Sequence, residues 1–277
     1  MGKRALQATR ALRWLALVAL AAPATAIAQA RVVDLTRGAI APTAGFAAND
    51  CHPISRLAPA HVSLRDRAVL VRTASGQRRH SWAVGDEFMW IATTRSVVVI
   101  GIGTSASHET RYAFAIDVAS GERRWRRELR TRAAANLRGA ILVETEDALV
   151  ILDAATGVER SRTSSTSNLV RVCREQNHYL IKTTSHLHVV DAASLSFRWS
   201  RPSSSGTGPR VVGPWVVDAW VDRQRDRFGV VVYDQQGRVS RTIDVGKTGG
   251  WYDIERVVLA PIDNNRIGVN ATFGVEF

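Results

Sequence analysis

Short apolar runs recur along this chain, and clusters of turn-forming residues separate one run from the next. Runs of about four to eight residues rich in Val, Ile and Leu are typical of β-strands, because strand side chains alternate between two faces. After residue 30 no segment shows a sustained helical period. The pattern therefore predicts an all-β chain whose strands are grouped mostly in fours from residue 61 onward.

One hairpin-like stretch, residues 115–125 (AIDVASGERRW), returns in less complete copies. Its Asp can accept hydrogen bonds from turn N–H groups, and its Gly supplies a positive φ at low cost. Its Trp can cover apolar surface beyond the second strand. The repeated positions are Asp117, Gly121 and Trp125, then Asp153 and Gly157, then Asp191 and Trp199, and finally Asp234.

These copies recur about every forty residues, a period typical of repeat architectures. A unit of this size can bury its faces only against its neighbours. We therefore expect a β-propeller of four-stranded blades, about six in number, with five or seven as the alternatives. We also expect these blades to curl into a closed ring.

The pattern A-x-D-x-x-S-G-x-x-x-W at 115–125 resembles the repeat of the pyrroloquinoline-quinone (PQQ)-type β-propellers, and the resemblance covers about residues 68–245. In that family the turn joins the third and fourth strands of a blade, and the Trp docks between blades. Here Leu195 replaces one Gly, while His80 and Ser161 occupy Trp positions, so those junctions must pack differently. The quinone dehydrogenases of this superfamily use a vicinal Cys pair, which this chain lacks. The resemblance implies a non-enzymatic branch with no cofactor.

Residues 1–30 have the pattern of a secretory signal peptide, with a basic start, a short apolar core at 14–22 and Ala28-Gln29-Ala30 as a cleavage site. The core is shorter than the roughly 20 residues needed to span a bilayer. We expect cleavage after Ala30 and a periplasmic or secreted protein with no transmembrane segment. We expect residues 31–60 to form an irregular segment, in which residues 32–35 could supply a strand that completes the last blade. We expect residues 61–277 to form the propeller.

The chain carries 37 Lys and Arg against 25 Asp and Glu, a net charge of +12, and only three of its basic residues are lysine. An exported protein rarely meets nucleic acid, so a basic surface favours another envelope protein or an anionic surface as partner. The alternative is a solvated surface that keeps a monomer soluble.

Cys51 and Cys173 make an even count, which in an oxidising compartment favours a disulfide, with two separate thiols as the alternative. His186 and His188 share a strand face and could bind a metal with His178, although two polar residues on a half-exposed strand explain them equally simply. We predict no metal ligands.

No catalytic constellation is predicted, because the chain has neither a G-x-S-x-G elbow nor a phosphate-binding loop. Trp82, Trp90, Trp215, Trp220 and Trp251 could line a ligand face or pack between blades. The sequence thus predicts a binding or scaffolding module of the bacterial cell envelope. The alternative is an enzyme or small-ligand sensor that uses the central channel of the propeller.

Overall fold

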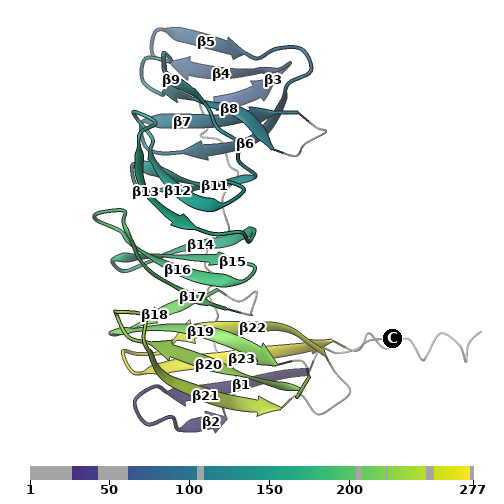
Figure 1. Ribbon diagram of the computed structural model, residues 1–277, viewed down its shortest axis with the longest axis vertical. Coiled ribbons are helices and arrows are strands. Elements are labelled where there is room, and N and C mark those ends of the chain that lie inside the picture. The colour runs from purple at the N-terminus through teal and green to yellow at the C-terminus, as the bar shows by residue number, and fades with distance from the viewer. Residues whose placement is uncertain are drawn as a thin grey trace, which may run out of the picture.

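The computed structural model describes residues 27–42, 62–104, 109–203, 208–222, 224–247 and 253–274. Within these ranges the chain forms six antiparallel sheets, of which five have four strands and one has three (Figure 1). The all-β fold and the count of six propeller blades are therefore confirmed.

The blades are numbered in chain order by the sheets they contain. Blade 1 holds β3 (Val62–Arg65), β4 (Ala68–Thr73) and β5 (Gly76–Ser81), and blade 2 holds β6 (Glu87–Thr93), β7 (Val97–Gly103), β8 (Thr110–Asp117) and β9 (Arg123–Glu128). Blade 3 holds β10 (Ala133–Leu137), β11 (Ala140–Glu144), β12 (Ala148–Asp153) and β13 (Glu159–Ser164). Blade 4 holds β14 (Leu169–Glu175), β15 (His178–Thr183), β16 (His186–Asp191) and β17 (Phe197–Pro202). Blade 5 holds β18 (Arg210–Val212), β19 (Trp215–Asp222), β20 (Arg227–Tyr233) and β21 (Val239–Lys247).

Blade 6 combines the two ends of the described chain. It contains β22 (Asp253–Pro261) and β23 (Arg266–Gly274), and on the other side of β23 it contains β1 (Ile27–Asp34) and β2 (Ile40–Pro42). β1 begins before the predicted cleavage point, but the part that cleavage would leave, residues 31–34, still pairs with residues 266–269. Val33 and Leu35 are buried against this blade's core.

In blades 2 to 5 the pairing of the third and fourth strands shifts register at the same place. The shift falls just before the repeated Asp in each case, between positions 115 and 116, 151 and 152, 189 and 190, and 232 and 233. A bulge bends the strand locally and leaves one residue unpaired. The same bend therefore recurs in four successive blades.

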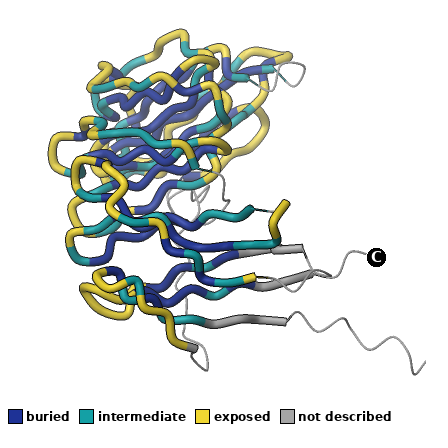
Figure 2. The backbone as a smooth tube through the Cα atoms, turned by 60° about the horizontal axis from the view of Figure 1, so that its bottom comes forward, coloured by how far each residue is buried: buried dark blue, intermediate teal, exposed yellow. Residues whose placement is uncertain are grey.

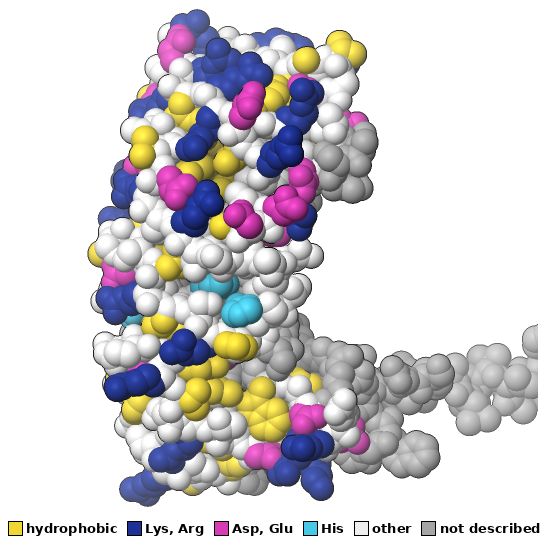
Figure 3. All heavy atoms as spheres, viewed as in Figure 1, with side chains coloured by type: hydrophobic (Ala, Val, Ile, Leu, Met, Phe, Trp, Pro, Cys, Tyr) yellow, Lys and Arg dark blue, Asp and Glu magenta, His cyan; other side chains and the backbone are white. Residues whose placement is uncertain are grey.

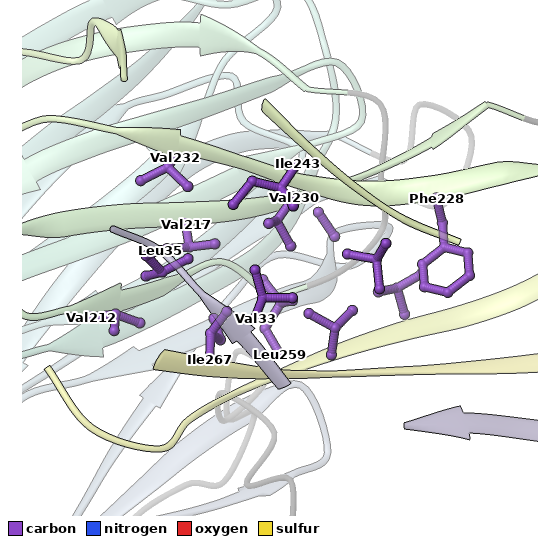
Figure 4. Packing of buried hydrophobic residues seen from close by; sticks show 14 of the residues in the cluster. Val33, Leu35, Val212, Val217, Phe228, Val230, Val232, Ile243, Leu259 and Ile267 are labelled. Atoms are coloured by element: carbon purple, nitrogen blue, oxygen red, sulfur yellow. The ribbon is translucent and has the colours of Figure 1, made fainter. Parts of the chain in front are cut away.

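The buried side chains form five apolar clusters, one in each junction between consecutive blades. Buried segments run along the strands and exposed ones lie mostly at the turns (Figure 2). In the junction of blades 5 and 6, for example, Val230 and Val232 of β20 pack with Leu259 of β22 and Ile267 of β23 (Figure 4). Each sheet thus buries its faces against its sequence neighbours, as the repeat predicts.

The expectation of a closed ring is wrong for the described part of the chain. Blades 1 and 6 lie at opposite ends of an open arc (Figure 1), and none of the five clusters joins them. The physical reason is visible on blade 1. Val69 and Val71 of β4 face blade 2, so Leu70 and Arg72 face away from it. Ser63 and Arg79 lie opposite Leu70 in the register, so polar side chains surround this leucine on the outer face. A terminal repeat with a polar outer face needs no further neighbour.

Candidate functional site

The repeated turn is organised by its aspartate. Asp117 Oδ1 accepts a hydrogen bond from the Ser120 backbone N–H at 2.7 Å, and Arg124 Nε donates to Asp117 Oδ2 at 3.0 Å. Gly121 has a φ of 72°, which a residue with a Cβ rarely adopts. The bonds from Ser120 and Arg124 hold the pKa of Asp117 at about 2, below its ordinary 3.8. This carboxylate is committed to its turn and is not available for acid–base chemistry.

The later turns repeat this arrangement. The aspartate accepts a backbone bond from the residue three positions on, and an arginine seven positions on contacts its second oxygen. The pairs are Asp153 with Arg160 and Asp191 with Arg198. Asp234 instead uses Arg238, four positions on, at 2.7 Å. In the first three turns the paired arginine follows the aspartate by seven positions, a D-x6-R spacing that the sequence analysis did not identify.

In four of the repeated units the residue at the position equivalent to Trp125 links its blade to the next one. Trp125 Nε1 donates to the Ala154 carbonyl at 3.0 Å, and Trp199 Nε1 donates to the Gln235 carbonyl at 3.2 Å. His80 and Ser161 occupy the equivalent position in their own repeats and also contact the following turn. His80 Nε2 lies 2.8 Å from the Gly121 carbonyl oxygen, and Ser161 Oγ donates to the Leu195 carbonyl at 2.8 Å. Each junction therefore contacts a carbonyl of the following turn: the tryptophans reach the residue after the Asp, while His80 and Ser161 reach the residue four positions after it.

The histidines considered as metal ligands lie in blade 4. His186 and His188 have ring centroids 5.8 Å apart, and His178 lies on the adjacent strand. Both ring nitrogens of His188 are buried without a hydrogen-bond partner among the described residues, and burial lowers the pKa of His188 to about 4. No group of three or more His, Cys, Asp or Glu side chains suited to a metal ion occurs among the described residues.

Cys173 is buried on β14 and is disulfide-bonded. The chain contains one other cysteine, Cys51, which lies outside the described residues. The predicted pairing of these two therefore stays a prediction.

A recess with a volume of about 640 Å³ opens on blade 2, and sequence reasoning missed it. Its lining includes Asp86, Arg111, Tyr112, Arg126, Glu128 and Arg130. These residues come from the segment before β6, from β8, and from β9 and the residues just after it, so no local motif joins them. We call this site the arginine recess.

Within the arginine recess the side chains hold one another in place. The guanidinium carbon of Arg126 lies 4.1 Å from the centroid of the Tyr112 ring, a cation–π contact. Arg111 Nη1 lies 3.3 Å from Asp86 Oδ1, and the Tyr112 hydroxyl donates to Asp86 Oδ2 at 3.4 Å. Burial and the Asp86 charge raise the pKa of Tyr112, so its hydroxyl keeps its proton at neutral pH.

The surroundings of the arginine recess are basic. β9 exposes Arg123, Arg124, Arg126 and Arg127 to solvent. In the space-filling view, basic and acidic side chains are interspersed over the end formed by blades 1 and 2, and further basic side chains lie at the opposite end (Figure 3). Arginine binds carboxylates through two parallel hydrogen bonds, so this region suits an acidic group.

Comparison with known proteins finds distant likenesses among solved structures. No family model matches the chain, and no curated protein matches it. Among solved structures it is similar to BamB from Moraxella catarrhalis, at 12% identity and a TM-score of 0.37 over 80% of this chain and 98% of that one. It is also similar to the Pan2 WD40 domain of Neurospora crassa, at 14% identity and a TM-score of 0.40 over 82% and 79%. At TM-scores below 0.5, these similarities carry no argument about the fold, ligand or partner of this chain.

Within the described ranges, no helix has the length and apolar character required to cross a membrane.

Proposed function

We propose that this protein is an exported binding module of the bacterial cell envelope, and that its arginine recess docks an acidic segment of a partner protein. The observation that carries the proposal is the recess itself, in which Arg111, Arg126 and Arg130 converge with Tyr112 on one cavity. Two acidic residues, Asp86 and Glu128, share the lining, so arginine exceeds acid by one charge there.

The shape of the site favours a discrete acidic group over a flat charged surface. A planar guanidinium recognises a carboxylate through a fixed pair of donors, and Arg126 is already oriented by its contact with Tyr112. An oriented side chain loses less rotamer freedom on binding than a free one. Binding to an anionic lipid surface would instead require a wide, continuous patch of positive charge, and here Asp86 and Glu128 lie between the arginines.

Export to the envelope is supported by two independent features. Residues 1–30 have the signal-peptide pattern, and Cys173 is disulfide-bonded, a state that persists in oxidising compartments. N-terminal sequencing of the periplasmic protein should begin at Arg31, and mass spectrometry of the unreduced protein should find Cys51 linked to Cys173. A retained leader, or two alkylatable thiols, contradicts this part of the proposal.

The competing function, an enzyme or sensor built on a central channel, has no observation in its favour. The described blades form an open arc, so they enclose no channel between them (Figure 1).

The docking proposal is tested with a fluorescein-labelled acidic peptide in which glutamate and alanine alternate. The variant Arg126→Glu/Arg130→Glu should weaken binding at least about tenfold, because two recess arginines become repulsive. The matched control Arg162→Glu reverses an exposed arginine of β13 outside the recess and should leave the affinity unchanged. Equal binding by wild type and double variant, or binding only to vesicles that contain phosphatidylglycerol, overturns the proposal.

A further inference from the structure

The charges that line the arginine recess are not all available to a partner. Asp86 is committed within the protein, because Arg111 Nη1 lies 3.3 Å from its Oδ1. Arg126, Glu128 and Arg130 remain, and none of the three makes an ion pair within the described part of the chain. They carry two positive charges and one negative charge, so a single additional carboxylate balances them.

The arginine recess is much larger than one carboxylate requires. Its volume of about 640 Å³ lies in the range of roughly 300–1,000 Å³ that is typical of pockets enclosing a drug-sized ligand. A second carboxylate is a poor occupant of the remaining space, because it would meet Glu128 and Asp86 without an arginine left to pair with. The remaining space therefore suits an uncharged group.

The guanidinium of Arg126 indicates which uncharged group fits. Tyr112 covers one face of this planar group, with the guanidinium carbon 4.1 Å from the ring centroid. Arg126 as a whole is exposed to solvent, so its second face remains accessible to a partner. Guanidinium planes stack on aromatic rings. Ala83 and Leu129 add apolar surface to the lining, so an aromatic side chain matches both features.

We propose that the arginine recess recognises an acidic residue with an aromatic residue two positions away, in an extended segment of a partner protein. The carboxylate pairs with Arg130, and the aromatic ring stacks on the second face of Arg126. Alternate residues of an extended chain lie on one face, so both side chains can enter the same recess. The inference rests on the proposed function, because it specifies the acidic segment that this recess docks.

Calorimetric titration of the full chain with blocked pentapeptides tests this specificity. Phe-Ala-Glu-Ala-Phe should bind at least about tenfold more tightly than Ala-Ala-Glu-Ala-Ala, because only the first supplies a ring on either side of the acid. Glu-Ala-Glu-Ala-Glu should bind within about threefold of the single-glutamate peptide, since one carboxylate balances the recess. Phe-Ala-Gln-Ala-Phe should bind at least about tenfold more weakly than its glutamate counterpart.

Three variants show whether the recess causes these differences. Arg126→Lys keeps the charge but lacks the planar guanidinium, so the advantage of the aromatic peptide should fall to about threefold or less. Arg123→Lys is the matched control, because Arg123 is exposed on the same strand outside the lining, and it should keep the full advantage. Glu128→Gln removes the free negative charge, so the three-glutamate peptide should gain at least about threefold over the single-glutamate peptide.

The inference is overturned if the aromatic peptide binds no better than the single-glutamate peptide, or if Phe-Ala-Gln-Ala-Phe binds equally well. Equal losses of the aromatic advantage in Arg126→Lys and Arg123→Lys overturn it too. The docking proposal survives these results as long as the alternating Glu–Ala peptide still loses affinity in Arg126→Glu/Arg130→Glu. Failure of every glutamate peptide to bind overturns both.

Discussion

The junction of blades 2 and 3 and the junction of blades 3 and 4 solve one packing problem in opposite ways. In the first, Trp125 reaches across to the next turn, where Gly157 has a φ of 71° and a Cβ would lie 2.9 Å from the indole. In the second, the small Ser161 reaches across, and the turn position is filled by Leu195, which is buried despite a φ of 57°. In the first junction the large side chain comes from the earlier blade, and in the second it comes from the later blade.

This comparison teaches that the junction conserves filled volume rather than residue type. Blades 4 and 5 repeat the first solution, because Trp199 packs on Gly237, where a Cβ would lie 2.5 Å from the indole. In every case the reaching side chain bonds to a carbonyl of the next turn, so the backbone arrangement is the constant feature. Protein interiors are close-packed, which explains why a large residue on one side requires a small one on the other.

The largest expected effect comes from emptying the tryptophan junction. Trp125→Ser should lower the free energy of unfolding by about 3 kcal/mol, because it leaves a cavity and removes the bond to Ala154. Adding Gly157→Leu should restore part of that loss, since the pair then imitates Ser161 and Leu195. Urea unfolding of the single and double variants measures this coupling. A double variant less stable than Trp125→Ser would contradict volume conservation.

His188 should make the junction of blades 3 and 4 sensitive to acid. The unfolded chain binds a proton there near pH 6.5 and the folded protein only near pH 4, so stability is complete above pH 6.5 and falls as the pH drops towards 4. The loss should reach at most about 3 kcal/mol. His188→Leu should abolish this loss in thermal melts between pH 7 and 4, whereas the control His186→Gln should retain it. If His188→Leu shows the same dependence of stability on pH as the wild type, His188 is not the group responsible for the acid sensitivity.

Gly157→Ala tests the turn side of the tryptophan junction. A Cβ at this positive φ strains the backbone and meets the Trp125 ring, so we expect a loss of about 2 kcal/mol. Gly139 also has a positive φ of 71° but nothing within 4 Å of an added Cβ, so Gly139→Ala should cost only the backbone term. Chemical denaturation of both variants separates the cost of backbone strain at a positive φ from the cost of the clash with the Trp125 ring. Equal losses would show that contact with Trp125 is immaterial.

The smallest effect should come from the turn aspartate. Asp117→Asn removes the ion pair with Arg124 but keeps an acceptor for Ser120, so it should cost about 1 kcal/mol at neutral pH. The contribution of Asp117 is present above its unfolded pKa of 3.8 and is lost as the pH falls through about 2. The variant should therefore be less sensitive to pH over that interval. Asp147→Asn, at an exposed side chain of another turn, is the control.

Prediction from sequence was most successful where the signal lies within a few residues. The strand runs and repeated turns gave an all-β chain with six blades, because hydrogen bonds such as Asp117 to Ser120 join residues three positions apart. The arginine recess was not found. Its residues meet from separate strands and loops, as Asp86 and Arg111 do, and no local spacing records that meeting.

The sequence by itself determined the hairpin unit, its period and the number of blades, because strand alternation and turn chemistry act over short stretches of chain. The tertiary structure alone decided that the described blades form an open arc and that the large side chain lies on one side of some junctions and on the other side of others. These features depend on which faces meet and how completely they fill the space between them. That is settled only when side chains from different blades pack together.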